Sequence, residues 1–367
     1  MKRILHITGS LDRGGTETFI MNVYREIRKM NVIFDFLLFS NSKGGFYEEA
    51  RSLGSKIYIL PSRKDGLYKY LISLDKFFKT HHAEYEIVHH SACTLTTIAP
   101  QYFAKKYGIS CIIEHAHSSR SEGLHNYFLH LINRMFIQKI ATKFLACSEK
   151  AALFFYSQRK DYVILKNGVN LSHFSYNEEL RDEVRHNLGL LSTDLVFVHV
   201  GRFVAVKNHT FLIDVFVHIL KEKKNAKLLL IGDGELKSSI HNKVINLGLI
   251  NSVIFLGERT DVYKILQAAD EMIFPSIYEG LPFALVEAQA AGLRIFSSDA
   301  VSRESNITDN VYFSPLSKGA EAWAQFIIQN INYKRIKQDD KIIEKGFSIE
   351  ETTDILYRIY ANQSKIF

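Results

Sequence analysis

The sequence has little cysteine, little proline and no long hydrophobic run. Its 3 cysteines include no CxxC pair, so a disulfide framework and a thiolate zinc site are both disfavoured and a reducing compartment is expected. With 5 prolines and 20 glycines in 367 residues, the chain is neither collagen-like nor of low complexity. No apolar run approaches the ~18 residues of a membrane-spanning helix. The first apolar stretch is also too short for the core of a signal peptide, so we expect a soluble, intracellular protein.

Length and charge distribution together indicate two domains of different character. A chain of 367 residues that is 47% hydrophobic can form two cores, at roughly 150 residues per domain. Residues 1–170 hold 24 Lys and Arg against 14 Asp and Glu, a net charge of +10, whereas residues 171–367 hold 22 against 25, a net charge of −3. The basic half is therefore expected to meet an anionic partner, and nucleic acid, a membrane surface and a phosphate-bearing substrate all qualify.

The hydrophobic pattern predicts two consecutive α/β domains. Near-continuous apolar runs, typical of parallel strands buried on both faces, alternate with amphipathic stretches typical of helices. Strands are predicted over residues 3–7, 32–40, 56–60, 86–90, 110–114, 143–147 and 162–166, and again over 195–201, 227–232, 252–257, 271–275 and 293–298. Helices are predicted over residues 16–30, 66–82, 95–107, 124–141 and 349–363. The polar stretch 167–193 breaks this alternation, so we place the domain boundary near residue 170.

A glycine-rich loop follows the first predicted strand. Gly9, Gly14 and Gly15 lie in it, and Thr16 is expected to cap the next helix. Glycine lets the backbone approach a ligand closely, and a helix N-terminus presents free N–H groups to an anion. An ordinary strand-to-helix turn explains the loop about as well. The loop lacks the GxGxxG of nicotinamide-binding proteins, which argues against a dehydrogenase.

Two cations follow the strand predicted over 195–201. Arg202 and Lys207 flank a short loop at the carboxyl end of this strand, where open α/β sheets bind their ligands. Arginine binds a pyrophosphate through paired hydrogen bonds and lysine binds it as a point charge; a solvated basic loop is the alternative. A tight turn with Gly232 and Gly234 follows the next strand. It is mainly structural, although Gly232 permits close approach of a nucleotide.

The most specific stretch is PSIYEGLPFALVEAQAAGL, which begins at residue 275. Glu279 precedes the tripeptide GLP, whose Pro282 is expected in the first turn of a helix, and Glu287 follows on that helix. The loop carboxylate can accept hydrogen bonds from sugar hydroxyls, and Glu287 can hold a diol such as ribose. Paired carboxylates also suit glycoside hydrolysis. A capped helix with two exposed acids is the alternative that involves no ligand.

In this order, the four elements resemble the retaining family 4 glycosyltransferases of GT-B architecture, the group 1 glycosyltransferases of bacterial surface polysaccharide synthesis. The resemblance extends from residue 1 to about 345 and rests on Gly14, Gly15, Glu17, Gly201, Arg202, Phe203, Lys207, Asn208, Gly232, Gly234, Glu279, Gly280, Leu281, Pro282 and Glu287. It implies an α/β protein with two Rossmann-like, doubly wound domains facing each other across a cleft. Residues 1–170 would bind the acceptor, residues 171–345 would bind the donor, and residues 346–367 would form a helix crossing back to the first domain.

The same resemblance implies roles for individual residues. Arg202 and Lys207 would bind the diphosphate of a nucleotide-sugar donor and stabilise the leaving charge, so that no metal is needed. Glu287 would hold the ribose, and Glu279 would contact the transferred sugar. The complete set of expected donor-binding residues is Gly14, Gly15, Arg202, Lys207, Gly232, Gly280, Leu281 and Glu287. UDP is the expected nucleotide because it is the commonest in the family, with GDP and ADP left open.

His115 and His117 follow the strand predicted over 110–114. In the family a histidine in this loop lies near the donor sugar and the acceptor, so these two and Glu279 are the candidate catalytic residues. A neutral imidazole can hydrogen-bond a sugar hydroxyl or pass on a proton, and strand register favours His115. Two further adjacent histidine pairs show that the chain is simply rich in histidine, which argues against metal ligation.

The segment 124–144 is apolar and aromatic, with Arg134, Lys139 and Lys143 but no acidic residue. A helix in the membrane interface has this composition, and a helix buried on the sheet has nearly the same one. The basic charge of the first half favours peripheral contact with the inner face of the cell membrane, with a polyprenyl-diphosphate-linked glycan as acceptor. No recognised nucleic-acid-binding motif accompanies the charge, so nucleic acid is not an expected partner.

Other classes share the architecture and stay open at this point. A GT-B-fold phosphorylase, a nucleotide-sugar epimerase and a non-catalytic partner protein are the alternatives. The two glutamates together with the Arg/Lys loop favour sugar transfer over these. We expect a retaining glycosyltransferase of capsular, exo- or O-antigen polysaccharide synthesis.

Overall fold

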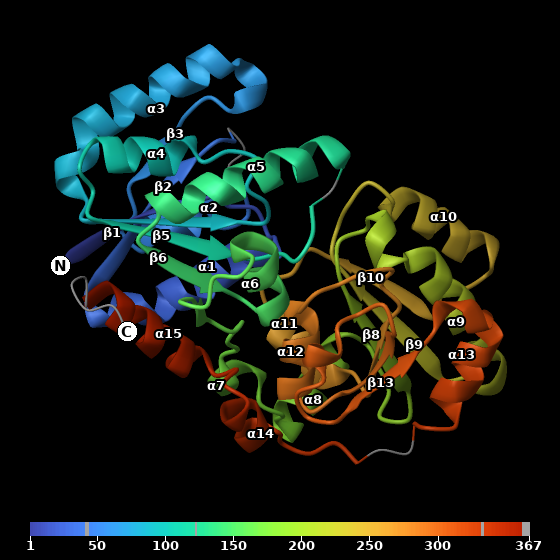
Figure 1. Ribbon diagram of the computed structural model, residues 1–367. Helices are drawn as coiled ribbons and strands as arrows, with labels where there is room; N and C mark the ends of the chain where they lie inside the picture. Colours follow the sequence, from blue (N-terminus) through green and yellow to red (C-terminus); the bar gives the residue numbers. More distant parts are fainter. Residues whose placement is uncertain (41–43, 122, 332–333, 362–367) are drawn as a thin grey trace. The chain divides into compact units, whose positions relative to one another are not determined.

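The computed structural model describes all residues except 41–43, 122, 332–333 and 362–367 (Figure 1). The chain forms two compact units, one made of Met1–Gly168 together with the chain from Ile349 onward, the other of Val169–Ser348. Each unit is built on one sheet in which all strand pairs are parallel. The prediction of two α/β units with parallel sheets is therefore confirmed.

The first unit has a seven-stranded sheet in the order β3-β2-β1-β4-β5-β6-β7. Its strands are β1 (Lys2–Ile7), β2 (Val32–Leu38), β3 (Ile57–Ile59), β4 (Ile87–Ala92), β5 (Cys111–Ala116), β6 (Lys143–Ala146) and β7 (Val163–Ile164). Its α-helices are α1 (Gly15–Ile27), α2 (Tyr47–Ser52), α3 (Leu67–His81), α4 (Ala99–Lys106), α5 (Leu124–Ile140), α6 (Glu149–Tyr156) and α15 (Ile349–Ala361). The strand order reverses between β1 and β4, and ligands of open α/β sheets bind beyond the carboxyl ends of strands at such a reversal.

The second unit has a six-stranded sheet in the order β10-β9-β8-β11-β12-β13. Its strands are β8 (Leu195–Val200), β9 (Ala226–Ile231), β10 (Val253–Gly257), β11 (Glu271–Phe274), β12 (Arg294–Ser298) and β13 (Val311–Ser314). Its α-helices are α7 (Leu171–Phe174), α8 (Glu178–Asn187), α9 (His209–Glu222), α10 (Lys237–Asn246), α11 (Val262–Ala268), α12 (Phe283–Ala290), α13 (Gly319–Ile328) and α14 (Asp339–Glu344). Here the order reverses between β8 and β11, so the loops that follow these two strands become neighbours.

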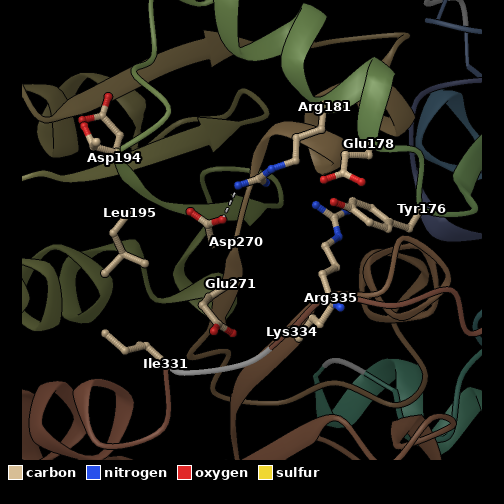
Figure 2. A pocket seen from close by; sticks show the side chains of 11 residues that line it. Tyr176, Glu178, Arg181, Asp194, Leu195, Asp270, Glu271, Ile331, Lys334 and Arg335 are labelled. Carbon is tan, nitrogen blue, oxygen red and sulfur yellow. Dashed lines mark hydrogen bonds and ion pairs between the residues drawn. The ribbon is translucent and has the colours of Figure 1, made fainter.

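A charged pocket of 440 Å³ lies where β8 and β11 begin, at the amino edge of the second sheet (Figure 2). Arg181 pairs with Asp270 at 2.5 Å, and Arg335 lies over the ring of Tyr176, 4.4 Å from its centroid (Figure 2). Both arginines also donate hydrogen bonds to backbone carbonyls at the end of α11. The pocket is thus lined by groups that anchor α8 and the segment around residue 335 to α11.

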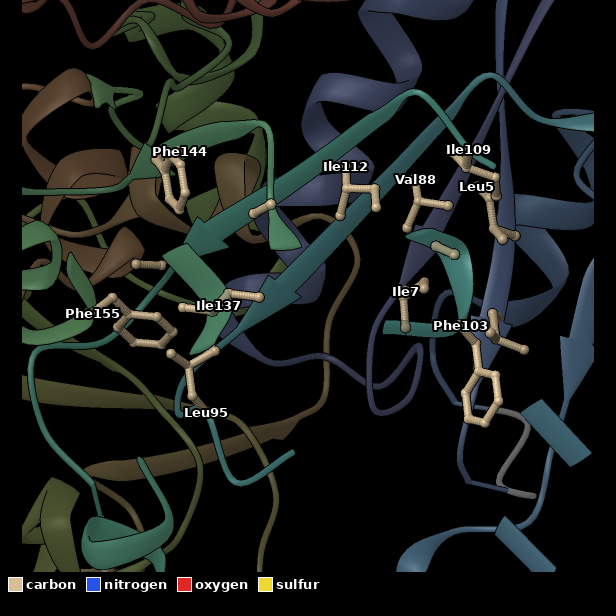
Figure 3. Close-up of a cluster of buried hydrophobic side chains, with 14 of the residues drawn as sticks. Leu5, Ile7, Val88, Leu95, Phe103, Ile109, Ile112, Ile137, Phe144 and Phe155 are labelled. Carbon is tan, nitrogen blue, oxygen red and sulfur yellow. The ribbon is translucent and has the colours of Figure 1, made fainter. Parts of the chain in front are cut away.

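A continuous hydrophobic core fills one side of the first sheet (Figure 3). Strand residues Leu5, Val88 and Ile112 contribute to it, and Phe103 of α4 and Ile137 of α5 close it from outside. Helices α3, α4 and α5 lie over this face, while α1 and α15 pack together on the other (Figure 1). Because the strands are covered on both faces, they read as unbroken apolar runs in the sequence.

Element boundaries differ from the sequence prediction mainly where elements are short. The helix predicted over 95–107 begins only at Ala99, with Pro100 in its first turn. Helices α2, α6, α8 and α13 and strand β13 are among the elements absent from the prediction. Three of them, α2, α6 and β13, are no longer than eight residues and establish little periodicity, and α8 lies within the polar stretch 167–193 that was predicted only to separate the domains. The chain passes to the second unit after Gly168 and returns to the first after Ser348.

Candidate functional site

Lys207 and Glu279 meet at the strand-order reversal of the second unit. Lys207 lies in the loop after β8 and Glu279 in the loop after β11, and their Nζ and Oε1 atoms are 2.6 Å apart. The side chains remain 16% and 20% exposed, so the pair is partly withdrawn from water and still accessible. The Lys207 ammonium also lies 5.0 Å from the centroid of the Phe274 ring. The structure thus brings together two residues that are 72 positions apart in the sequence.

The backbone of the two loops is joined at several points. The Ile277 N–H donates to the Val206 carbonyl at 2.8 Å, and the Asn208 side-chain amide donates to the Pro275 carbonyl at 3.2 Å. Asn208 has φ 57° and connects a short 3₁₀ turn to α9, a left-handed conformation that asparagine tolerates better than most residues. Arg202 is exposed on the same loop, so both predicted cations belong to one tethered segment.

Gly232 has a structural reason to be glycine. Its φ is 134°, and a Cβ built there would lie 2.2 Å from the Gly201 carbonyl oxygen. The loops after β8 and β9 therefore touch through backbone alone. Gly232 therefore lies beside the loop that carries Arg202 and Lys207, and this close backbone contact explains why the position requires glycine.

Glu287 lies on α12 and is half-buried. Burial raises its pKa from 4.5 to about 7, because desolvation penalises the carboxylate more than the neutral acid. Near neutral pH this group is therefore balanced between accepting and donating a hydrogen bond. The preceding Gly280 and Leu281 lie in the loop before α12, where the Leu281 side chain packs against a small apolar cluster. Pro282 takes the N-cap position with extended backbone angles, so its expected place in the first turn is wrong by one residue.

Two buried histidines that the sequence analysis did not single out lie under the loop with the cations. The Nδ1–H of His199 in β8 donates a hydrogen bond to the Ile273 carbonyl at 2.8 Å, and the His199 ring centroid is 4.7 Å from that of His209. Burial, with a smaller contribution from Lys207, lowers the pKa of His209 to about 4. Burial also lowers the pKa of His199 well below its ordinary value, so both rings are neutral. A histidine inside an otherwise apolar strand, and one directly after Asn208, were the available signals.

Gly14 and Gly15 lie at the strand-order reversal of the first unit, after β1. Gly14 is the N-cap of α1 and no side chain caps this helix end, so the expected cap by Thr16 is wrong. Thr16 sits in the first turn instead, its Oγ1 3.4 Å from Cys93 Sγ in the loop after β4. A Cβ on Gly15 would meet no atom within 4 Å, so the space in front of this residue is open.

The two candidate histidines occupy different environments. His115 lies inside β5 and is fully buried, because the pairing of β5 with β4 continues to Ala116. The expectation that His115 emerges from the strand is therefore wrong. His117 is one residue beyond the strand and partly exposed, and its ring centroid is 4.0 Å from that of His115. Burial lowers the pKa of His117 to about 3, so its imidazole is neutral.

Among the described residues, no helix combines the length and apolarity needed to cross a membrane. In the same residues no three or more His, Cys, Asp and Glu side chains gather as a metal site would need.

Two Rossmann-like units, each built on one parallel sheet, are the architecture of the GT-B glycosyltransferases. The structure matches the crystal structure of Anabaena Alr3699/HepE in complex with UDP and glucose with a TM-score of 0.78, at 18% identity, over 98% of this chain and 100% of that one. The family model of glycosyl transferases group 1 matches residues 181–348.

The relatives place the chain within that class. It is 30% identical over 372 residues to the putative glycosyltransferase EpsF of Bacillus subtilis (strain 168). This match covers 98% of this chain and 96% of that protein. The capsular polysaccharide biosynthesis glycosyltransferase CapH of Staphylococcus aureus is 26% identical, over 99% of this chain and 100% of its own length. The UDP-Gal:alpha-D-GlcNAc-diphosphoundecaprenol alpha-1,3-galactosyltransferase of Escherichia coli is 29% identical, over 61% of this chain and 60% of its own length.

The chain belongs to the group 1 glycosyltransferases. It has the GT-B fold and is a glycosyltransferase of polysaccharide biosynthesis.

Proposed function

We propose that the protein is a retaining transferase that moves a sugar from a UDP-sugar to a lipid-linked glycan acceptor. The observation that carries this is the Lys207–Glu279 pair, 2.6 Å apart, with Arg202 exposed on the same loop. Two cations beside a carboxylate match a donor that joins a diphosphate to a sugar. UDP as the nucleotide is supported by the names of the Anabaena structure and of the E. coli relative.

The Lys207–Glu279 ion pair is expected to separate when the nucleotide-sugar donor binds. Without donor, the Lys207 ammonium is neutralised by Glu279. When donor binds, the diphosphate oxygens take over Lys207, and Glu279 is released to accept a hydrogen bond from a hydroxyl of the transferred sugar. Arg202 adds a bidentate contact to the diphosphate. Glu287, with its pKa raised to about 7, accepts hydrogen bonds from the two ribose hydroxyls in its ionised form.

The reaction then needs charge stabilisation at the leaving group. The bond between the anomeric carbon and the diphosphate breaks with its electron pair on the phosphate oxygen, where Arg202 and Lys207 stabilise the charge without a metal. The acceptor hydroxyl attacks the anomeric carbon on the face that the diphosphate leaves and gives its proton to the departing phosphate oxygen. The configuration of the sugar is retained. In the first unit, His117 is the candidate to hydrogen-bond a sugar hydroxyl, and the open space at Gly15 is the candidate to admit a ligand.

Helix α5 supports peripheral membrane contact and hence a lipid-linked acceptor. Among the described residues, only His130 and Ile137 of this helix are buried. Five of its large apolar side chains are instead exposed, with Leu124 at 89%; the others are Tyr127, Phe128, Met135 and Phe136. Such a face, together with Arg134 and Lys139 on the same helix, is typical of a helix in the headgroup region of anionic lipid.

Exposed apolar side chains also occur on helices α3 and α4 of the same unit. Leu67 and Tyr68 begin α3 and are strongly exposed, as is Tyr102 on α4 between α3 and α5. The loop after β3 leads into α3 and the loop after β5 leads into α5, and His117 lies in the second of these loops. A lipid-linked diphosphate held at the bilayer surface would therefore reach the edge of the sheet that carries this histidine.

The test is a transfer assay without added metal and with EDTA. UDP-, GDP- and ADP-sugars are offered with a synthetic polyprenyl-diphosphate-linked sugar, and the product is identified by mass and by the anomeric coupling constant. We expect product from a UDP-sugar with unchanged anomeric configuration. Product only with inverted configuration, or glycosyl phosphate released from a glycan by inorganic phosphate, would contradict the proposal.

A further inference from the structure

A buried chain of polar side chains crosses the first sheet from α15 to the end of β5. It consists of Tyr360 on α15, His6 on β1, His89 on β4 and His115 on β5, each at most 2% exposed. The Tyr360 hydroxyl lies 2.7 Å from His89 Nδ1 and 3.2 Å from His6 Nε2. His89 Nε2 lies 3.2 Å from His115 Nδ1. The sheet register explains the alignment, because His6 pairs with His89 across the β1–β4 ladder.

The neighbouring ionisable groups belong to other contacts. Side chains alternate between the faces of a strand, so His90 points away from His89 and pairs with Glu114 at 3.0 Å. Cys111 of β5 is the other titratable group whose charge acts on Tyr360, and it is buried and reduced. The ring of His117 contacts that of His115, with the two planes tilted by 40°. The polar chain therefore begins at His6, passes through Tyr360 and His89, and ends at His115, next to His117.

All three rings of the chain are neutral. Burial lowers the pKa of His6 to about 3 and the pKa values of His89 and His115 well below the ordinary value. Each neutral ring has one N–H donor and one bare nitrogen acceptor. If His89 carries its proton on Nε2, it donates to a bare Nδ1 of His115, and Tyr360 donates to His89 and accepts from His6. If His89 carries it on Nδ1, every donor and acceptor reverses. The three rings must therefore share one tautomer.

We propose that Tyr360 and His89 are positioning residues that fix the tautomer and ring orientation of His115, and through the contact between the two rings the orientation of His117. His115 Nε2, at the site end of the chain, and His117 Nε2 have no hydrogen-bond partner among the described residues. A sugar hydroxyl or a water is the chemistry that would satisfy either nitrogen. The role in sugar transfer rests on the function proposed above, whereas the tautomer rule does not.

The inference is tested by nitrogen-15 NMR of the full-length protein with labelled histidine, the rings being assigned through single histidine substitutions. In the wild-type protein, His6, His89 and His115 should all show Nε2–H or all show Nδ1–H. Tyr360→Phe removes one oxygen atom and should leave His89 and His115 as tautomer mixtures. Kinetically, we expect kcat to fall about tenfold and the donor KM to change less than about twofold, as when a transition-state interaction is lost. Tyr357→Phe, on the exposed side of the same helix, is the matched control and should change nothing.

Each result decides one part of the inference. Unlike tautomers or a charged ring in the wild-type protein would overturn the hydrogen-bonded chain. Unchanged tautomers, or an unchanged kcat, in Tyr360→Phe would overturn the positioning role. A protein with matched tautomers that transfers no sugar would instead count against the proposed function.

Discussion

The two units share one reversal of strand order each, but they place different residues at it. In each, the strand order reverses at one point, between β1 and β4 in the first unit and between β8 and β11 in the second. The first unit places glycines after β1 and the buried, neutral imidazoles of His6 and His89 on the two strands themselves. The second places a partly exposed Lys207–Glu279 ion pair there. A shared fold therefore fixes where a ligand binds, and the residues at that point decide which charge it carries.

This difference matches the two ends of a transfer reaction. The leaving diphosphate needs fixed positive charge, which Arg202 and Lys207 can supply. The acceptor hydroxyl is neutral, and a neutral imidazole can hydrogen-bond it without imposing a charge. The strongest tests of this division change the charged site first.

Removing the cation of the ion pair should have the largest effect. Lys207→Ala is expected to lower kcat by ~10²–10³-fold, the range seen when a group that stabilises transition-state charge is deleted. Initial-rate kinetics with a UDP-sugar measure this. Lys221→Ala, an exposed lysine on α9 of the same unit, is the control. Full activity in Lys207→Ala would remove the basis for placing the donor diphosphate in the second unit.

Glu287 should make stability depend on pH in a defined direction. Its pKa of about 7 in the folded protein lies above the ordinary 4.5, so the folded state binds more protons between these values and loses stability as pH rises through that window. Glu287→Gln should therefore stabilise the protein by as much as ~3 kcal/mol at pH 8 and by little at pH 4. Urea unfolding at both pH values measures this.

The same variant should bind UDP more weakly, because the amide offers the ribose one acceptor in place of two. Binding is measured by titration calorimetry at pH 8. A stabilisation that is equal at both pH values would show that Glu287 is not desolvated in the folded protein.

Arg202→Lys keeps the charge and removes the fork of paired donors. We expect kcat/KM to fall by about tenfold, since one of two parallel hydrogen bonds to the diphosphate is lost. The measurement is the same initial-rate assay. Equal loss in Arg202→Lys and Arg202→Ala would indicate bidentate geometry, whereas full activity in the lysine variant would indicate that charge alone suffices.

The smallest effect is expected at the surface of the first unit. Tyr127→Ser combined with Phe128→Ser should reduce binding to phosphatidylglycerol vesicles by about fivefold, because two exposed rings no longer enter the interface. Vesicle flotation measures binding. Ile250→Ser, an equally exposed apolar residue of the second unit, is the control. Unchanged flotation of the double variant would separate the apolar face of α5 from the membrane.

Most strands could be predicted from the sequence because buried parallel strands leave unbroken apolar runs. The cation-bearing loop could also be placed, since Arg202 and Lys207 follow such a run directly. Which strands become neighbours could not, because that depends on connections made far along the chain. The pairing of Lys207 with Glu279 is a consequence of β8 lying beside β11 and carries no local signal.

The histidines show the same limit more sharply. Strand register favoured His115 over His117 as the counterpart of the family's histidine, but the ladder between β4 and β5 extends to Ala116 and keeps His115 inside the sheet. Its partner His89 belongs to another strand, and Tyr360 lies 271 residues beyond His89 in the chain. Burial and hydrogen bonding of this kind are set by tertiary packing, which a one-dimensional pattern does not contain.

The placement of α15 has a consequence for biosynthesis. The second unit is a continuous stretch, Val169–Ser348, nested within the first, whose parts are separated by that stretch. On the ribosome the second unit can finish folding while the first still lacks α15, since domains fold as they emerge. Until residue 360 is made, His6 and His89 have no hydroxyl between them, and the face of the sheet beside α1 stays uncovered. The first unit begins synthesis first and is completed last.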